Sequence, residues 1–132
     1  MQQEEWKNEA HYWPIRWLKL LARFPHKYKT WLWFGHTMPN GDPAEPLGPN
    51  TKMNGMMLIP PLTVSTDFWK LRVRDDKIIH FFAIVPLYQD EMDLKLKKGA
   101  ETIVQGFEKA KYSELLDLSR RSVAASPWWK LF

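Results

Sequence analysis

The stretch from residue 68 to residue 85 constrains the fold more than any other part of the chain. Phe68 to Arg74 alternates apolar and basic side chains, Asp75 to Lys77 is polar, and Ile78 to Val85 is apolar except at His80. Alternation is typical of a strand with one wet face, whereas a short continuous apolar run is typical of a strand buried on both faces. The pattern predicts a β-hairpin whose second strand, with His80, lies inside a sheet.

Two more strands are predicted before this hairpin. Thr30 to Phe34 is apolar on both faces, with two tryptophans on one side, and Met56 to Pro61 is a short apolar segment that ends in two prolines. Residues 37–55, between them, hold four prolines, three glycines and three asparagines. Long connections of this kind are uncommon in compact domains and are often functional or disordered. We expect this loop to be the most mobile element.

Helices are predicted before and after the strands along the chain. Pro14 to Phe24 has apolar residues three and four apart, and Pro25 is expected to end that helix. Asp90 to Lys109 reads as a second helix, capped by Asp90, and residues 113–116 suggest a further short turn of helix. The buried face of the second helix is expected to consist of Met92, Leu96, Ala100, Ile103 and Phe107.

The order of these elements predicts one α+β domain over residues 1–132, with helices packed against a mixed, mostly antiparallel sheet. The chain has no cysteine, which excludes disulfides and thiolate chemistry. Its N-terminus is polar and acidic, unlike a signal peptide, and its longest apolar run is about half of a membrane span. We expect a soluble, cytoplasmic protein that does not contact membranes.

No arrangement of residues indicates an enzyme. The serines stand in no nucleophile motif, the glycines form no phosphate-binding loop, and the four histidines lack the paired spacing of helical zinc ligands. We therefore expect no catalytic residues, no metal and no cofactor. The formal net charge is +4, but the basic residues are dispersed and no groove-reading motif accompanies them, so no nucleic-acid partner is expected.

The aromatic content points instead to an interface. Eight tryptophans and seven phenylalanines are more than a small core needs, and tryptophan is a favoured anchor in protein interfaces. Gly35 and His36 follow the aromatic strand at the start of the long loop. The His36 ring either fixes the loop by bonding its backbone or contacts a ligand. Arg72 lies among three cations on one strand face, which are either solvated or available to an acidic partner.

Several motifs together resemble a known family. A helix that ends in "LLARF", a strand that runs into Gly-His, a Pro-rich loop and the segment "IIHFFAIVPLYQDEMDLKLKKGA" are similar to the Suppressor of Fused domain, most closely to its short bacterial members. The resemblance covers most of residues 13–123. Its most specific piece is the junction of strand and helix from Val85 to Glu91.

The resemblance implies an α/β sandwich-like domain that binds protein and has no enzymatic activity. Animal members hold a transcription-factor peptide as an added strand in a cleft, and bacterial members are associated with toxin systems as immunity proteins. Animal members have Gly-Asp-His where this chain has Gly35-His36, which puts that mode of peptide capture in doubt. The partner is expected to be a protein, such as a toxin domain. The predicted partner-binding residues are Phe24, Trp33, Gly35, His36, Arg72 and Glu91.

Two other functions remain open. One is a small-molecule-binding protein or unrecognised enzyme with a pocket under residues 37–55, in which His36, Tyr88 and Glu91 supply polar groups. The other is a homo-oligomer that associates through the aromatic segment at residues 126–132, "SPWWKLF".

Overall fold

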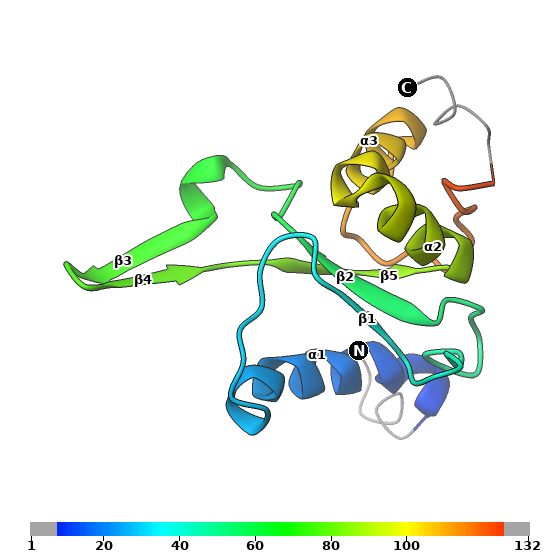
Figure 1. Cartoon of the computed structure of the whole chain (residues 1–132), viewed down its shortest axis with the longest axis horizontal. Coiled ribbons are helices and arrows are strands. Elements are labelled where there is room, and N and C mark those ends of the chain that lie inside the picture. Colours follow the sequence, from blue (N-terminus) through cyan, green and yellow to red (C-terminus); the bar gives the residue numbers. More distant parts are fainter. Residues whose placement is uncertain (1–7, 126–132) are drawn as a thin grey trace.

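The computed structural model describes residues 8–125, in which a three-stranded sheet has helices on both faces (Figure 1). α1 lies on one side of the sheet, and α2 and α3 lie together on the other. This arrangement confirms the predicted α+β class. In chain order the elements are α1 (Glu9–Lys27), β1 (Thr37–Pro39), β2 (Gly55–Ile59), η2 (Thr66–Phe68), β3 (Lys70–Arg74), β4 (Lys77–His80), β5 (Ala83–Leu87), α2 (Gln89–Lys98) and α3 (Ala100–Ala110).

β2 is the central strand of the sheet. The order is β1-β2-β5, both pairings are antiparallel, and Met57 lies opposite Thr37 on one side and Val85 on the other. All five residues of β2 are buried. Successive side chains point to opposite faces of a strand, so Met56 packs toward α1 while Met57 packs toward α2 and α3.

Each face of the sheet has its own hydrophobic cluster. The cluster toward α2 and α3 has Ile103 and Phe107 at its centre and also contains Val85 and Leu87. The cluster toward α1 is formed by Trp13, Leu21, Leu47, Met53 and Met56. The predicted strand at 56–59 and the predicted buried positions Met92, Ile103 and Phe107 are confirmed.

The hairpin of β3 and β4 forms, but it does not belong to this sheet. Among the described residues, β3 and β4 pair only with each other, and they extend away from the sheet and helices (Figure 1). The predicted strand from Ile78 to Val85 is divided into β4, a break at residues 81–82, and β5. The prediction that His80 lies inside a central strand is therefore wrong, because His80 is exposed. A single apolar run can contribute one strand to each of two sheets. The local sequence pattern does not distinguish this case from one long strand.

Both helix predictions need new boundaries. α1 begins at the Asn8 cap, whose side chain accepts a hydrogen bond from the Ala10 N–H, and it continues through Pro25 to Lys27. Pro25 removes one backbone N–H from the end of the helix, and the Tyr28 N–H still donates to the Phe24 carbonyl. The second helix is two helices that meet at Gly99, which has a φ of +97°. Leu96, predicted to be buried, is 77% exposed, because Glu91, Met92 and Leu94 form the buried side of α2 and Leu96 lies outside it.

The predicted strand at 30–34 is wrong, whereas the predicted mobility of residues 37–55 stays a prediction. Residues 31–36 form an irregular segment with a turn, and β1 begins only at Thr37. Residues 40–54 are tied to α1, since the Trp13 Nε1 donates to Asn50 Oδ1 at 2.8 Å and the Trp17 Nε1 donates to the Leu47 carbonyl at 3.0 Å. Residues 113–116 form no helix. The aromatic segment at 126–132 lies outside the described residues.

Candidate protein-interaction surface

Exposed hydrophobic side chains gather on and around the β3–β4 hairpin. Every residue from Lys70 to His80 is exposed. Of the fifteen exposed large hydrophobics of the described residues, four lie in this range and five more lie at residues 31–33, 64–68 and 81. We call these nine residues the hairpin surface: Trp31, Trp33, Val64, Phe68, Leu71, Val73, Ile78, Ile79 and Phe81. Leu71 and Ile79 lie opposite each other on one face of the hairpin, and adjoining exposed apolar side chains are typical of interaction sites.

The two faces of the hairpin differ in chemistry. Leu71 lies opposite Ile79, and this pair forms an apolar face. Arg72 lies opposite Ile78 on the other face, next to the pair of Lys70 and His80. A hollow of about 620 Å³ lies over that second face, lined by the same four residues together with Thr66, Asp67 and Trp69. Two cations and one carboxylate border the hollow, which therefore favours an acidic group.

Three aromatic rings join the hairpin to the sheet. Trp33 packs edge-on against His80, with ring centroids 4.6 Å apart, and against Phe82, with centroids 5.4 Å apart. His80 is the last residue of β4, and Phe82 immediately precedes β5. The Trp33 ring is still 43% exposed. Trp33 therefore supports the base of the hairpin and also offers ring surface to a partner.

A turn at residues 33–36 places Trp33 and His36 together. The Trp33 N–H donates to His36 Nδ1 at 3.2 Å, and the His36 N–H donates to the Trp33 carbonyl at 3.1 Å. The Trp31 ring lies 4.8 Å from the His36 ring. The backbone of Leu58 holds this turn against the sheet, since it accepts from the Gly35 N–H at 2.8 Å and donates to the His36 carbonyl at 3.0 Å. His36 thus fixes the segment that carries both exposed tryptophans.

Gly35 is required by this turn, and replacing it is expected to destabilise the protein. Its φ is +80°, and a Cβ would lie 2.9 Å from the Cβ of Ala100. Gly99 provides a matched control, because its φ is +97° but a Cβ there would meet nothing within 4 Å. Left-handed backbone costs a non-glycine residue roughly 1–2 kcal/mol. In urea unfolding, Gly99→Ala should lower the free energy of unfolding by that backbone cost alone. Gly35→Ala should lower it by more. Equal losses would contradict a close contact with Ala100.

Two of the predicted partner-binding residues lie apart from the hairpin surface. Phe24 is half-buried on α1, where its ring centroid is 4.7 Å from that of Tyr28. Glu91 is fully buried in the first turn of α2. The structure brings together Trp33, Gly35 and His36, and it places Arg72 on the adjoining hairpin.

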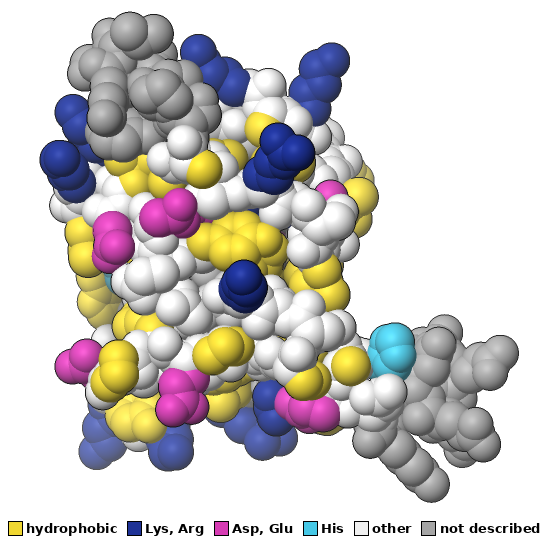
Figure 2. All heavy atoms as spheres, turned by 90° about the vertical axis from the view of Figure 1, so that its right-hand side faces the viewer, with side chains coloured by type: hydrophobic (Ala, Val, Ile, Leu, Met, Phe, Trp, Pro, Cys, Tyr) yellow, Lys and Arg dark blue, Asp and Glu magenta, His cyan; other side chains and the backbone are white. Residues whose placement is uncertain are grey.

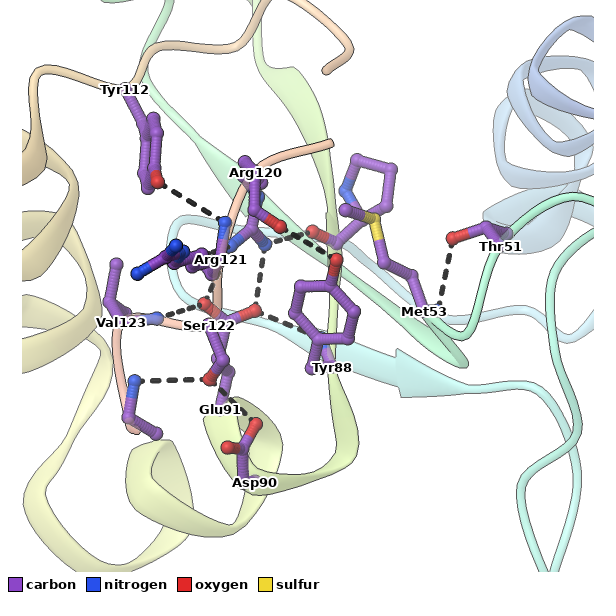
Figure 3. Close-up of polar contacts among 12 residues, drawn as sticks. Thr51, Met53, Tyr88, Asp90, Glu91, Tyr112, Arg120, Arg121, Ser122 and Val123 are labelled. Atoms are coloured by element: carbon purple, nitrogen blue, oxygen red, sulfur yellow. Dashed lines mark hydrogen bonds and ion pairs between the residues drawn. The ribbon is translucent and has the colours of Figure 1, made fainter. Parts of the chain in front are cut away.

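Glu91 and Arg120 form a buried ion pair instead (Figure 3). Arg120 Nη2 donates to Glu91 Oε1 at 2.7 Å, and Nη1 donates to Oε2 at 2.8 Å. Backbone N–H groups of Tyr88 and Val123 each donate to the same carboxylate at 2.9 Å. Arg120 Nη2 also donates to the Pro86 carbonyl at 2.8 Å, and Nη1 donates to the Arg121 carbonyl at 3.1 Å. The pair fastens the segment after α3 to the junction of β5 and α2.

The predicted small-molecule pocket does not gather its three polar groups. The Tyr88 hydroxyl donates to the Arg120 carbonyl at 2.8 Å, and Glu91 is enclosed by the network just described. His36 contacts Trp31 and Trp33. Within residues 8–125, no group of three or more His, Asp or Glu side chains is placed to hold a metal ion.

Positive charge outside the hairpin is divided between the two helical layers. Figure 2 shows Lys and Arg side chains toward both ends of one face, near α2–α3 and near α1, with hydrophobic side chains between them. α1 alone carries Arg16, Lys19, Arg23 and Lys27. This face therefore has no single basic patch, in agreement with the dispersed charge of the sequence.

Sequence reasoning missed Arg120 and Trp31 as important positions. Arg120 lies 29 residues after Glu91, and no local pattern links the two. Trp31 was assigned to a buried strand face, whereas it is 66% exposed. The excess of tryptophan over what a small core needs was the available signal.

The fold has a counterpart among solved structures, in "the Sufu-Fu complex crystal structure". The TM-score is 0.71 at 15% sequence identity, and the match covers 90% of this chain and 49% of that chain. The model of the family described as Suppressor of fused protein matches residues 1–121. This chain belongs to the Suppressor of fused family.

The Suppressor of fused assignment agrees with the resemblance in the sequence and with the α+β fold. This member spans about half the length of the solved chain that it matches. A search of curated proteins finds no match. No helix within residues 8–125 is both long and apolar enough to cross a membrane.

Proposed function

We propose that this protein is a non-enzymatic protein-binding module that holds a segment of a partner protein on the hairpin surface. The exposed apolar face of the hairpin is the observation that supports this proposal. An isolated two-stranded hairpin is only marginally stable in water, and this one leaves Leu71 and Ile79 on an uncovered apolar face. A partner segment that covers this face would stabilise the hairpin and bury both residues.

Strand addition is the binding mode that suits this geometry. Within residues 8–125, β3 and β4 pair only with each other, so in this part of the chain each has an edge whose backbone groups can pair with an extended segment. The exposed rings of Trp31 and Trp33 adjoin the base of the hairpin and supply aromatic anchors. Arg72 and Lys70, at the hollow beside it, favour an acidic side chain in that segment.

The biological role that we propose is inhibition of a cognate bacterial toxin by steric occlusion, as an immunity protein. Membership in the Suppressor of fused family and the resemblance to its short bacterial members support this role. The net charge of +4 favours an acidic toxin domain over a basic, polyanion-binding one, because like charges slow association.

The proposal predicts that Leu71→Ser/Ile79→Ser abolishes capture of the partner. Loss of two apolar contacts in an interface should weaken binding at least about tenfold. Tagged wild-type protein and variants would be used to capture partners from the native host, and the affinity for the captured protein would then be measured by calorimetry. Leu96→Ser is the matched control, because Leu96 is 77% exposed on α2 and lies outside the hairpin surface.

Co-expression tests the role itself. The captured protein should arrest growth when expressed alone and should be harmless together with the wild-type chain. The hairpin variant should not protect, although its circular dichroism spectrum remains that of the folded protein. Equal capture by the wild-type chain and the hairpin variant would overturn the proposed surface.

A further inference from the structure

The outer edge of β3 presents its backbone groups in a fixed order. The Phe81 N–H donates to the Trp69 carbonyl at 2.9 Å, in the same register that pairs Leu71 with β4. Backbone groups point alternately to the two sides of a strand. Leu71 therefore directs its N–H and carbonyl toward β4, whereas Lys70 and Arg72 direct theirs away from β4. Within residues 8–125 no strand pairs with this outer edge, and the hairpin extends away from the helices (Figure 1).

The side chains along the same edge alternate in chemistry. Lys70 and Arg72 point to one face of the hairpin, and Leu71 between them points to the other. Neither cation is paired with a carboxylate within the described part of the chain, and Arg72 donates to the Asp75 carbonyl at 3.3 Å. Leu71 is 52% exposed. The edge therefore offers two cations on one face and apolar surface on the other.

The outer edge of β4 has no such order. Ile78 and His80 direct their backbone groups outward there, but one side chain is aliphatic and the other is an imidazole. The His80 ring also packs against Trp33, with centroids 4.6 Å apart. Ile79 is 38% exposed, which is less than the exposure of Leu71 opposite it. β3 is therefore the edge that is better suited to strand addition.

We propose that β3 pairs with an extended segment of the partner protein in which acidic and apolar residues alternate. The inference rests on the proposed function, because it takes the occupant to be a segment of a partner protein. Residues directly opposite each other on neighbouring strands share a face. Acidic residues therefore lie opposite Lys70 and Arg72, and the apolar residue between them lies opposite Leu71. Acidic residues two positions apart on a strand are separated by roughly 6.7 Å, which is also the spacing of two alternate residues of β3.

The segment runs antiparallel to β3, since antiparallel pairing is the more stable orientation per residue. In this orientation the residue directly opposite Lys70 exchanges both backbone hydrogen bonds with it, and the same holds at Arg72. Each acidic residue thus adds backbone hydrogen bonds to its ion pair. The regular part of the edge ends at Arg72, because the register against β4 shifts between Arg72 and Arg74. The recognised core is therefore an acidic-apolar-acidic sequence.

The charge of this edge opposes pairing with a second copy of the same chain. Two β3 strands that paired antiparallel about Leu71 would place Lys70 of one copy opposite Arg72 of the other. Like charges directly opposite each other are destabilising, and lysines on edge strands protect proteins against self-pairing in this way. An acidic segment replaces this repulsion with attraction, so the edge favours such a partner over a copy of itself.

Labelled peptides test the sequence rule without the native partner. The peptide Val-Glu-Val-Glu-Val should bind the wild-type chain, and the peptide with lysine in place of both glutamates should bind at least about tenfold more weakly, as measured by fluorescence anisotropy. Lys70→Glu/Arg72→Glu should reverse that preference. Lys19→Glu/Arg23→Glu is the matched control, because it changes the net charge equally at exposed positions of α1. It should keep the wild-type preference.

Backbone methylation of the acidic peptide tests the register. N-methyl groups on both glutamates should weaken binding at least about tenfold, because these N–H groups donate to β3. N-methyl groups on two of the valines should change binding by no more than about twofold, since the valine N–H groups point away from β3. The peptide Val-Val-Glu-Glu-Val should bind roughly threefold more weakly, because one glutamate then meets the apolar face.

Several outcomes would overturn the inference. They are equal binding of the acidic and basic peptides, a preference that Lys70→Glu/Arg72→Glu leaves unchanged, and equal losses from the two methylated peptides. A wild-type dimer that the acidic peptide dissociates would also overturn it, because a second copy would then occupy β3. Size-exclusion chromatography with light scattering measures that last outcome.

This inference and the proposed function fail separately. If Leu71→Ser/Ile79→Ser captures the partner as the wild-type chain does, the proposed surface is wrong. If that variant loses capture while Lys70→Glu/Arg72→Glu binds the captured partner with unchanged affinity, the proposed function stands and the acidic segment is rejected.

Discussion

Replacing Arg120 with methionine is expected to lower the free energy of unfolding by about 3–5 kcal/mol, because it leaves an unpaired carboxylate in the protein interior. Glu91 is fully buried and Arg120 is nearly so, and two hydrogen bonds of 2.7 and 2.8 Å join them. Methionine preserves much of the apolar contact that the arginine makes with the surrounding rings of Tyr88, Phe107 and Tyr112. Urea unfolding followed by circular dichroism measures the loss.

Two further variants isolate the ion pair as the cause. Arg121→Met changes an exposed neighbour and should alter stability by no more than about 0.5 kcal/mol. Glu91→Gln/Arg120→Met removes both charges, so it should recover part of the stability that Arg120→Met loses. A double variant no more stable than Arg120→Met would show that the pair does not act through its charges.

Trp13→Ala is expected to cost about 3–5 kcal/mol, as large aromatic truncations in a core do. The Trp13 ring is 1% exposed and packs so closely on Gly48 that a Cβ at that glycine would lie 2.3 Å from it. Its indole N–H also holds Asn50, whose side-chain N–H donates back to the Ala10 carbonyl at 3.0 Å. The substitution therefore loosens residues 40–54 as well as α1.

Trp31→Ala is the matched control for Trp13→Ala. Trp31 is 66% exposed, so its truncation should change thermal and urea stability by at most about 0.5 kcal/mol. The same variant should weaken partner capture, because the ring belongs to the hairpin surface. If both tryptophans cost equal stability, the exposed ring would have a structural role and not a binding one.

The sequence predicts elements well where one pattern has one structural meaning. The short strand predicted within residues 56–61 is confirmed as part of β2, and residues three and four apart along α1 and α3 define their buried faces. The strand prediction for residues 30–34 is wrong because aromatic residues at alternate positions occur both in buried strands and in exposed turns. The prediction of one strand from Ile78 to Val85 is wrong for a similar reason. Hydrophobicity alone does not specify which strand, or which partner protein, packs against an apolar segment.

The proposed surface was predictable in part. Trp33, Gly35 and His36 lie together as their sequence proximity suggests, and the bonds between residues 33 and 36 give the reason. Glu91 was selected from the family resemblance, which marks the junction of β5 and α2 but does not separate contact residues from those that hold the fold. Its partner Arg120 lies in the segment that follows α3, and such long-range pairing has no local signature.

The position of β2 has a consequence for how the molecule loses its structure. Met56 belongs to one hydrophobic cluster and Met57, its neighbour, belongs to the other. The hydrophobic clusters on the two faces of the sheet therefore share β2. Displacing this strand exposes both clusters to solvent at once. Damage to either layer is transmitted through a single strand, so the helical layers and the sheet melt cooperatively as one unit, while the hairpin, which pairs only with itself, can open without them.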